Sequence, residues 1–282
     1  MNVHPKIAVI GSGVMGEAII AGLIRNGVTL PANIRVSDNR QERVDELHAS
    51  FGVSPFIDNS SAVSGADVVV LSVKPQRLDL VMFGLKDKIP NEALVLSIIA
   101  GATIEKISSG LGHHCVVRSM PNTPAQIGEG ITVWVASPLV SPEQLELSRR
   151  ILTALGQEVH AEEENFLDMA TALSGTGPAY VFLFMEALID AGVHLGFSRR
   201  IAEQLVTQTL RGSLDYYEKR MAHPASLRNE VTSPGGTSAE ALYYLEKAGF
   251  RTAISRAIWA AYERSKELGQ GKEAQVPDKK SD

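Results

Sequence analysis

The chain has 282 residues and a formal net charge of −5, from 27 Lys and Arg against 32 Asp and Glu. Its 44% apolar and 21% charged residues are typical of a globular protein and argue against a disordered or fibrous one. The acidic balance disfavours nucleic acid and anionic membranes as partners, because both need a positive surface. The single cysteine, Cys115, can form neither an intrachain disulfide nor a cysteine metal site.

The N-terminus does not have the pattern of a signal peptide, because glycines interrupt the apolar stretch that follows the polar residues 1–6. The longest apolar run, residues 93–102, is shorter than the ~20 residues that a membrane-spanning helix needs. We therefore expect a cytoplasmic protein without a membrane segment.

Short apolar runs alternate with helical patterns along the first half of the chain. The runs that indicate buried strands are residues 6–10, 34–37, 68–72, 94–98, 115–118 and 131–135. Helical patterns cover residues 13–26, which Gly27 ends, and residues 40–51. This alternation predicts an α/β fold of the Rossmann type, with a doubly wound parallel sheet.

The sequence changes character near residue 162, beyond which β-branched runs disappear. We expect a dinucleotide-binding domain over residues 1–161, an all-α substrate and dimerisation domain over 162–270, and a disordered tail over 271–282. Residues 180–193 form a helical pattern that is apolar nearly all round, so every side of that helix must be covered. Either a second subunit or the helix's own bundle could cover it, and both alternatives stay open.

Residues 11–16 have the pattern GxGxxG between a predicted strand and a predicted helix. Gly11 would permit the tight turn, Gly13 the approach of a pyrophosphate and Gly16 the close packing of helix on strand. Free N–H groups at the start of the helix would then hold the phosphates. The loop residues expected at a dinucleotide are Gly11, Ser12, Gly13, Val14, Met15 and Gly16.

Asp38 follows Gly16 at about the 20-residue distance typical of the residue that reads the adenosine ribose. Its carboxylate favours NAD, whereas Arg40 and Ser37 could hold the 2′-phosphate of NADP, so both cofactors stay open. Asn59 precedes a short predicted helix over residues 60–64 and could also be only its N-cap.

Loops of small, polar or proline-punctuated sequence follow three consecutive predicted strands, at residues 72–75, 97–101 and 118–124. In an open α/β sheet, ligands bind at the carboxyl ends of the strands. The cofactor residues that we expect on these loops are Ser72, Val73, Lys74, Pro75, Ile99, Ala100 and Asn122.

A second glycine-rich loop, residues 232–238, precedes the helical pattern at 239–247. Glycines, hydroxyls and free N–H groups at a helix start suit a small carboxylate or phosphate. Thr237 and Glu240 also have the spacing of a capping box, and both interpretations can hold together. Residues 174–178 form a similar turn, which can be a tight connection between helices.

The motifs at residues 11–16, 72–75, 120–124, 173–180 and 223–238 resemble those of the pyrroline-5-carboxylate reductases, and the resemblance covers about residues 6–268. It implies reduction of 1-pyrroline-5-carboxylate to L-proline with NADPH or NADH, the last step of proline synthesis. It also implies a homodimer that forms through the helical domain and that further assembly can enlarge.

The resemblance also implies roles for single residues. The substrate carboxylate would be held by Ser233, Gly235, Gly236, Thr237 and Ser238, a family acid falls on Glu164, and Asn59 and the Val-Lys-Pro loop fall on cofactor positions. Ser238 stands where threonine is commoner, and it keeps the hydroxyl. Asn39 stands where many members have an arginine near the 2′-phosphate.

Hydride transfer requires the imine carbon to be held against C4 of the nicotinamide. We expect the loop at 232–238 to bind the substrate carboxylate and so to orient one face of the substrate ring toward the nicotinamide. Ser238 is the candidate catalytic hydroxyl; solvent is the alternative proton donor. There are two alternative functions. A β-hydroxyacid dehydrogenase would need a catalytic lysine within residues 174–190, and this segment contains none. An NAD(P)-binding redox sensor would bind the cofactor without turnover. His113, His114 and His223 are expected at the surface or in turns, and we expect no metal.

Overall fold

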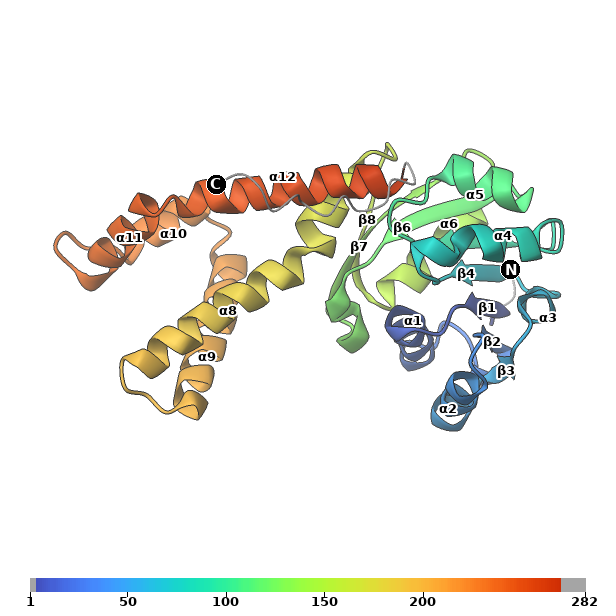
Figure 1. Cartoon of the computed structure of the whole chain (residues 1–282), viewed down its shortest axis with the longest axis horizontal. Coiled ribbons are helices and arrows are strands. Elements are labelled where there is room, and N and C mark those ends of the chain that lie inside the picture. Colours follow the sequence, from blue (N-terminus) through green and yellow to red (C-terminus); the bar gives the residue numbers. More distant parts are fainter. Residues whose placement is uncertain (1–3, 270–282) are drawn as a thin grey trace, which may run out of the picture. The chain divides into compact units, whose positions relative to one another are not determined.

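The computed structural model describes residues 4–269, which form two compact units. Within the described chain, the first unit comprises residues 4–176 and 261–269 and the second comprises Gly177–Ala260. Figure 1 shows the elements of both units. The predicted tail at 271–282 lies outside the described residues.

The first unit is built on an eight-stranded sheet with the order β3-β2-β1-β4-β5-β6-β7-β8. Its strands are β1 Ile7–Ile10, β2 Ile34–Ser37, β3 Ser54–Phe56, β4 Val68–Leu71, β5 Leu94–Ser97, β6 Val116–Met120, β7 Gly130–Ala136 and β8 Gly156–His160. The six predicted strands are present, whereas β3 and β8 were not predicted. Both are the outermost strands, and their sequences SPF and GQEVH lack a continuous apolar run.

Strands β1 to β6 are parallel, but β7 runs antiparallel to β6, with Arg118 opposite Val135. The expectation of a parallel sheet therefore fails at this one junction. A parallel neighbour needs a crossover of a dozen or more residues, usually a helix. Only the short 3-10 helix η3, Thr123–Ile127, lies between β6 and β7, so the chain turns back beside the strand that it has left.

Helices cover both faces of this sheet. They are α1 Val14–Arg25, α2 Gln41–Phe51, α3 Asn59–Val63, α4 Leu78–Leu85, α5 Ile104–Leu111, α6 Pro142–Thr153 and α7 Phe166–Ala170. Because side chains alternate along a strand, Ile7 and Val9 pack with α1, α2 and α6, whereas Ala8 and Ile10 pack with α3, α4 and α5. Figure 1 shows this doubly wound arrangement, with α4 and α5 on one side of the strands and α1 on the other.

The compact units divide after Thr176, later in the chain than the change of sequence character near residue 162. Helix α7 accounts for the difference, because buried Leu167 packs against Val135 and Ala161 beside the sheet. Helix α12 spans Phe250–Gly269, and its last part, residues 261–269, also belongs to the first unit. Ser265 in this part is buried.

The turn predicted at 174–178 is helical instead. A π-helical segment, η4 Thr171–Gly175, joins α7 to α8, and the helix continues over Phe166–His194. By length and composition alone it could cross a membrane, which the sequence interpretation missed when it took residues 93–102 as the longest apolar run.

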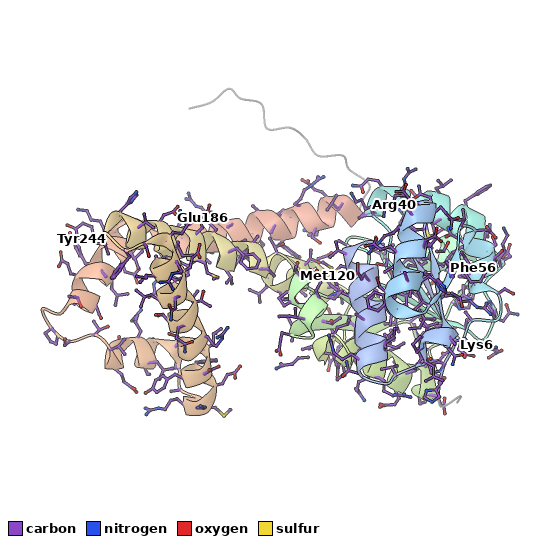
Figure 2. All side chains as sticks on the ribbon, turned by 90° about the horizontal axis from the view of Figure 1, so that it is seen from below. Lys6, Arg40, Phe56, Met120, Glu186 and Tyr244 are labelled. Carbon is purple, nitrogen blue, oxygen red and sulfur yellow. The ribbon has the colours of Figure 1, made fainter. Side chains whose placement is uncertain are left out.

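The second unit consists of α8 Gly177–His194, α9 Arg199–Arg220, α10 Pro224–Glu230, α11 Thr237–Lys247 and the first part of α12. Helix α8 packs against α9 but has no buried residue, and Phe182 and Leu183 are 62% and 67% exposed. Figure 2 shows the side chains of this unit, with Glu186 labelled on α8 and Tyr244 on α11. The described part of its own bundle therefore does not cover α8.

The histidines differ in part from the expectation. His113 is buried, and its Nε2 lies 2.7 Å from the carbonyl oxygen of Ala93, so placing it at the surface was wrong. His114 is exposed, and the Nδ1 of His223 accepts the N–H of Ala225 as the N-cap of α10. None of these contacts resembles a metal or catalytic arrangement.

Candidate functional site

The glycine loop joins β1 to α1, and two of its glycines are required by close contacts. Gly11 has a φ of +91°, and a Cβ there would lie 2.7 Å from the carbonyl oxygen of Ser72. A Cβ at Gly16 would collide with the carbonyl oxygen of Gly11. The position of a Cβ at Gly13, in contrast, has no atom within 4 Å. The loop is thus tightly packed at its two ends and open at Gly13.

The start of α1 presents unpaired backbone donors. Gly13 is the N-cap, and the first helical hydrogen bond runs from the N–H of Glu17 to the carbonyl of Gly13, at 2.9 Å. Within residues 4–269, the N–H groups of Gly13, Val14 and Met15 have no hydrogen-bond acceptor. Free N–H groups at a helix N-terminus form an anion site, so this end of α1 suits a pyrophosphate.

A cleft of about 340 Å³ opens beside this loop, entirely within the first unit. Its lining residues are Gly11, Gly13, Ser37, Asp38, Asn39, Arg40, Ile57, Asn59, Ser72, Val73, Lys74, Arg77, Leu80 and Val81. Figure 2 labels Arg40 on this unit. The structure thus brings together residues that follow or end the four strands β1 to β4 and residues of the helices α3 and α4.

Several of these cleft residues were not predicted as cofactor residues. Ile57 follows β3, a strand that the sequence interpretation missed. Arg77, Leu80 and Val81 reach the cleft because the 3-10 helix η2, Pro75–Arg77, leads directly into α4. No local sequence pattern marks these residues, because the exposure of Leu80 and Ile57 beside the cleft, 65% and 49%, depends on the tertiary structure.

Asp38 is held by donors of the protein itself. Its Oδ2 accepts the N–H of Ser12 at 3.2 Å, and its Oδ1 accepts both the N–H and the Nε of Arg40, each at 3.1 Å. The Asp38 side chain is only 10% exposed, against 63% for Arg40. Burial raises the pKa of the Asp38 carboxyl, but these hydrogen bonds outweigh burial and hold the pKa below its ordinary value of 3.8.

Asn59 does not act as a helix cap, so that alternative was wrong. The N-cap of α3 is Asp58, whose carboxylate accepts the N–H of Ser61 at 2.8 Å. Asn59 is the first residue of the helix, and its Oδ1 accepts the hydroxyl of Ser37 at 2.7 Å. This contact fixes the Asn59 amide at the wall of the cleft.

Ser72 carries a buried hydroxyl that lacks a hydrogen-bond partner in the described part of the chain. The hydroxyl oxygen would lie 3.3 Å from a Cβ at Gly16, so it adjoins the glycine loop. A buried unpaired polar atom is rare in a native structure and calls for a specific explanation. Together with the free N–H groups and the open position at Gly13, it fits a bound dinucleotide.

The remaining predicted cofactor residues do not line the cleft; they are Ser12, Val14, Met15, Gly16, Pro75, Ile99, Ala100 and Asn122. Asn122 is occupied by the protein, since its Nδ2 donates to the carbonyl of Ser174 and its Oδ1 accepts the N–H of Ile131. Ser12 and Ile99 are buried.

Glu164 also has partners within the first unit. Its Oε1 accepts the N–H of Ile104 at 2.8 Å and a hydrogen bond from Nη1 of Arg118 at 2.9 Å. Glu164 is predicted at the substrate, and neither of these contacts is evident from the sequence.

The second glycine loop lies in the helical unit and begins α11. Gly235 has a φ of +71°, and a Cβ at Gly236 would lie 2.6 Å from the hydroxyl oxygen of Ser233. Gly236 is the N-cap and Thr237 the first helical residue, so the capping box expected from Thr237 and Glu240 is absent. Within the described chain, the N–H groups of Thr237 and Ser238 have no acceptor. The loop therefore presents free donors, as expected for an anion site.

Two protein-family models match the chain. Residues 6–101 match the model "NADP oxidoreductase coenzyme F420-dependent", and residues 164–268 match "Pyrroline-5-carboxylate reductase dimerisation". The doubly wound sheet, the glycine loop and the cleft define an NAD(P)-dependent oxidoreductase. The chain is 43% identical to a pyrroline-5-carboxylate reductase of Synechocystis sp. over 94% of this chain and 98% of the relative. It belongs to the pyrroline-5-carboxylate reductase family.

Solved structures agree with this assignment. A pyrroline-5-carboxylate reductase from Coxiella burnetii has a TM-score of 0.85 at 38% identity, covering 94% of this chain and 98% of that chain. The pyrroline carboxylate reductase of Plasmodium falciparum with NADP bound has a TM-score of 0.88 at 32% identity, covering 95% and 99%. The predicted family, fold class and enzyme class are confirmed, and the matched dimerisation model supports homo-oligomerisation.

Proposed function

We propose how this chain performs the reaction of its family with the residues described above. The reaction is the reduction of 1-pyrroline-5-carboxylate to L-proline by hydride transfer from NAD(P)H, the last step of proline biosynthesis. The observation that carries the proposal is the cleft at the start of α1, which adjoins N–H groups and a Ser72 hydroxyl that have no partner in the described part of the chain.

The bound cofactor supplies the hydride, and the chain's own residues bind and orient it. The N–H groups of Gly13, Val14 and Met15 bind the pyrophosphate, and Ser72 donates its hydroxyl to the same ligand. The cleft residues Ile57, Leu80 and Val81 cover apolar surface of the adenosine half. Excluding water from this half strengthens the polar contacts made beside it.

Within this cleft, we propose a preference for NADPH. The Asp38 carboxylate is already satisfied by Ser12 and Arg40, which leaves it less able to accept the ribose hydroxyls of NADH. Arg40, Lys74 and Arg77 line the cleft against this single carboxylate, so a 2′-phosphate meets an excess of positive charge. The NADP-bound Plasmodium falciparum relative is in agreement.

The substrate carboxylate is assigned to the loop at 233–238 in the helical unit. Free N–H groups of Thr237 and Ser238 bind it, and the Ser238 hydroxyl adds a hydrogen bond at the same ligand. An anchored carboxylate fixes one face of the pyrroline ring toward the nicotinamide, which lowers the entropic cost of hydride transfer. Ser238 is the proposed catalytic hydroxyl. Glu164 remains a predicted substrate residue through Oε2, since its Oε1 is shared by Ile104 and Arg118.

We further propose that the oligomer is a homodimer formed through the helical unit, with α8 covered by the partner subunit. The matched dimerisation model spans residues 164–268, which include this helix. Burying the exposed side chains of α8, such as Phe182 and Leu183, removes a large apolar surface from water. A protein partner then covers the surface that length and composition alone would assign to lipid, in keeping with a cytoplasmic enzyme.

The function is tested by mixing purified protein with 1-pyrroline-5-carboxylate and following oxidation of NADPH and of NADH in parallel. Proline should form in proportion to the cofactor consumed, with a higher kcat/KM for NADPH. Cofactor binding without turnover would contradict the enzymatic assignment. Faster turnover with NADH would contradict only the proposed cofactor preference.

A further inference from the structure

A buried ion cluster lies in the first unit outside the cleft. Arg118 on β6 has a side chain that is only 3% exposed. Its Nη1 pairs with Oε1 of Glu164 at 2.9 Å, and its Nη2 pairs with Oδ1 of Asp168 on α7 at 3.1 Å. Removing one partner of a buried ion pair is strongly destabilising, because it leaves a buried charge without compensation.

The cluster joins segments that are far apart in the sequence. Oε1 of Glu164 accepts the N–H of Ile104, the first residue of α5, at 2.8 Å. Oδ1 of Asp168 accepts the hydroxyl of Ser265 on α12 at 2.9 Å. Strand β6, the start of α5, helix α7 and the end of α12 therefore share one set of polar contacts.

The loop from 98 to 103, between β5 and α5, is held by this set and its neighbours. At its start, the carbonyl of Ser97 accepts the hydroxyl of Ser119, which follows Arg118 on β6. At its end, Glu164 holds Ile104. In its middle, a Cβ at Gly101 would lie 2.7 Å from the backbone nitrogen of Gly269, at the end of α12. The loop is thus anchored at both of its ends and closely packed at Gly101.

This loop lies where the second half of a dinucleotide must go. Asp38 at the end of β2 marks the adenosine side, and the glycine loop at the end of β1 marks the pyrophosphate. The sheet continues from β1 through β4 to β5, so the nicotinamide half extends toward the carboxyl ends of β4 and β5. The loop after β5 carries Ile99 and Ala100 at that level.

We infer that Arg118, Asp168 and Ser265 are positioning residues for hydride transfer, because they fix the loop that supports the nicotinamide half. The inference rests on the proposed cofactor site at α1. These residues reach the loop at 98–103 indirectly. Arg118 shares Glu164 with the N–H of Ile104 at the end of the loop, and Asp168 pairs with Arg118. Ser265 lies on α12, whose last residue adjoins Gly101. A small displacement of a reacting group costs about 10²-fold in rate even when the mutation lies far from the reacting atoms.

The test compares Asp168→Asn and Ser265→Ala with Ser148→Ala as a matched control. Ser148 is also a buried serine of the first unit, and its hydroxyl donates to the carbonyl of Gln144 at 2.8 Å, away from the cluster. Asp168→Asn keeps the size of the side chain and removes the charge opposite Arg118. Ser265→Thr keeps the hydroxyl and serves as the rescue variant.

Four quantities are measured for each variant: the melting temperature, the dissociation constant of ADP-ribose, kcat, and the isotope effect on kcat with deuterium at the transferred position of the cofactor. We expect Asp168→Asn to lower kcat by about 10²-fold. The isotope effect should rise, because hydride transfer becomes slower than product release. Affinity for ADP-ribose, which lacks the nicotinamide, should be unchanged. Ser265→Ala should change kcat and the isotope effect in the same direction, and Ser265→Thr should restore both.

A purely structural role predicts a different pattern. Asp168→Asn and Ser265→Ala would then lower the melting temperature as Ser148→Ala does, with kcat per folded protein and the isotope effect unchanged, and this would overturn the inference. If Asp168→Asn does not fold, Ser265→Ala with its rescue variant decides the question. Failure of the wild-type protein to oxidise NAD(P)H with the imine acid would instead contradict the proposed function.

Discussion

Arg40 donates hydrogen bonds from both its backbone N–H and its side-chain Nε to Oδ1 of Asp38, each at a distance of 3.1 Å. The residue that conventionally selects NAD is therefore neutralised by a neighbour two positions along the chain. The guanidinium itself stays exposed at the cleft, where it can meet a phosphate. The proposed preference for NADPH therefore depends on this local contact between Asp38 and Arg40.

Replacing Arg40 with Ala should change the choice of cofactor. The variant loses a cation at the proposed 2′-phosphate position and releases the Asp38 carboxylate for ribose hydroxyls. We expect KM for NADPH to rise about tenfold, which corresponds to about 1.4 kcal/mol, and KM for NADH to fall or stay the same. Arg149→Ala, which removes an arginine from α6 outside the cleft, is the control. An equal rise for both cofactors would contradict the assignment.

The Asp38 contacts should also appear in the pH dependence of stability. The folded-state pKa of Asp38 lies below 3.8, so its stabilising contribution is present above that pH and is lost as the pH falls through the folded-state pKa. In urea unfolding, the free-energy difference between wild type and Asp38→Asn should therefore shrink as the pH is lowered below 3.8. The shrinkage should be smaller in an Arg40→Ala background. A difference that stays constant with pH would show that the carboxylate gains nothing from these donors.

Ser72→Ala should weaken cofactor binding without harming the free protein. Its hydroxyl is buried and has no hydrogen-bond partner within residues 4–269, so its removal breaks no hydrogen bond of this part of the apoprotein. We expect the dissociation constant of NADPH to rise about fivefold, equivalent to about 1 kcal/mol, and the melting temperature to stay the same or increase. Thr132→Val is a matched control. The Thr132 hydroxyl is also buried and has no partner among the described residues, but it lies on β7 and does not line the cleft. Equal affinities for wild type and Ser72→Ala would remove Ser72 from the site.

Replacing Gly13 or Gly16 of the same loop with alanine should have two different effects, one on cofactor affinity and one on stability. Gly13→Ala adds a methyl group to open space, so the protein should fold normally while affinity for the pyrophosphate falls at least tenfold. Gly16→Ala forces a collision with the carbonyl of Gly11, so unfolding should become easier by about 1–3 kcal/mol. Thermal melting and cofactor titration on both variants separate the two effects. Loss of stability in Gly13→Ala would show that its position is not open.

Ser238→Ala should raise KM for the imine acid and leave the affinity for NADPH unchanged. The loss of one hydroxyl contact to a carboxylate is worth about 1.5–3 kcal/mol, which is roughly a tenfold to hundredfold rise in KM. Ser213→Ala, an exposed serine on α9 whose hydroxyl donates to the carbonyl of Thr209, is the control within the same unit. If Ser238→Ala retains the wild-type KM, the carboxylate does not bind at this residue.

The parts of the fold that could be predicted depend on local sequence. The strands with continuous apolar runs, such as β4 and β5, and the glycine loop after β1 are short-range patterns. The antiparallel turn into β7 could not be predicted as readily, because it depends on the absence of a crossover helix rather than on the apolar run of β7 itself. Strand β8 has the polar sequence GQEVH and, among the described strands, pairs with β7 alone.

The candidate site divides in the same way. Asp38 and Lys74 follow predicted strands, and Asn59 precedes the predicted helix at 60–64; all three line the cleft, and their contact with a cofactor stays a prediction. The contact of Glu164 with Arg118 joins residues that are far apart in the sequence, so no local sequence pattern predicts it. The buried position of His113 was missed for the same reason, since its partner is the carbonyl of Ala93.

The end of α12 returns to the first unit, where Ser265 meets Asp168 and Gly269 packs on Gly101. During synthesis on a ribosome, residues 261–269 emerge after all of the helical unit. The first unit can therefore complete its native contacts only after residues 261–269 have been synthesised. A nascent chain that stops at residue 260 leaves Asp168 without Ser265, which links completion of this unit to synthesis of the entire helical unit.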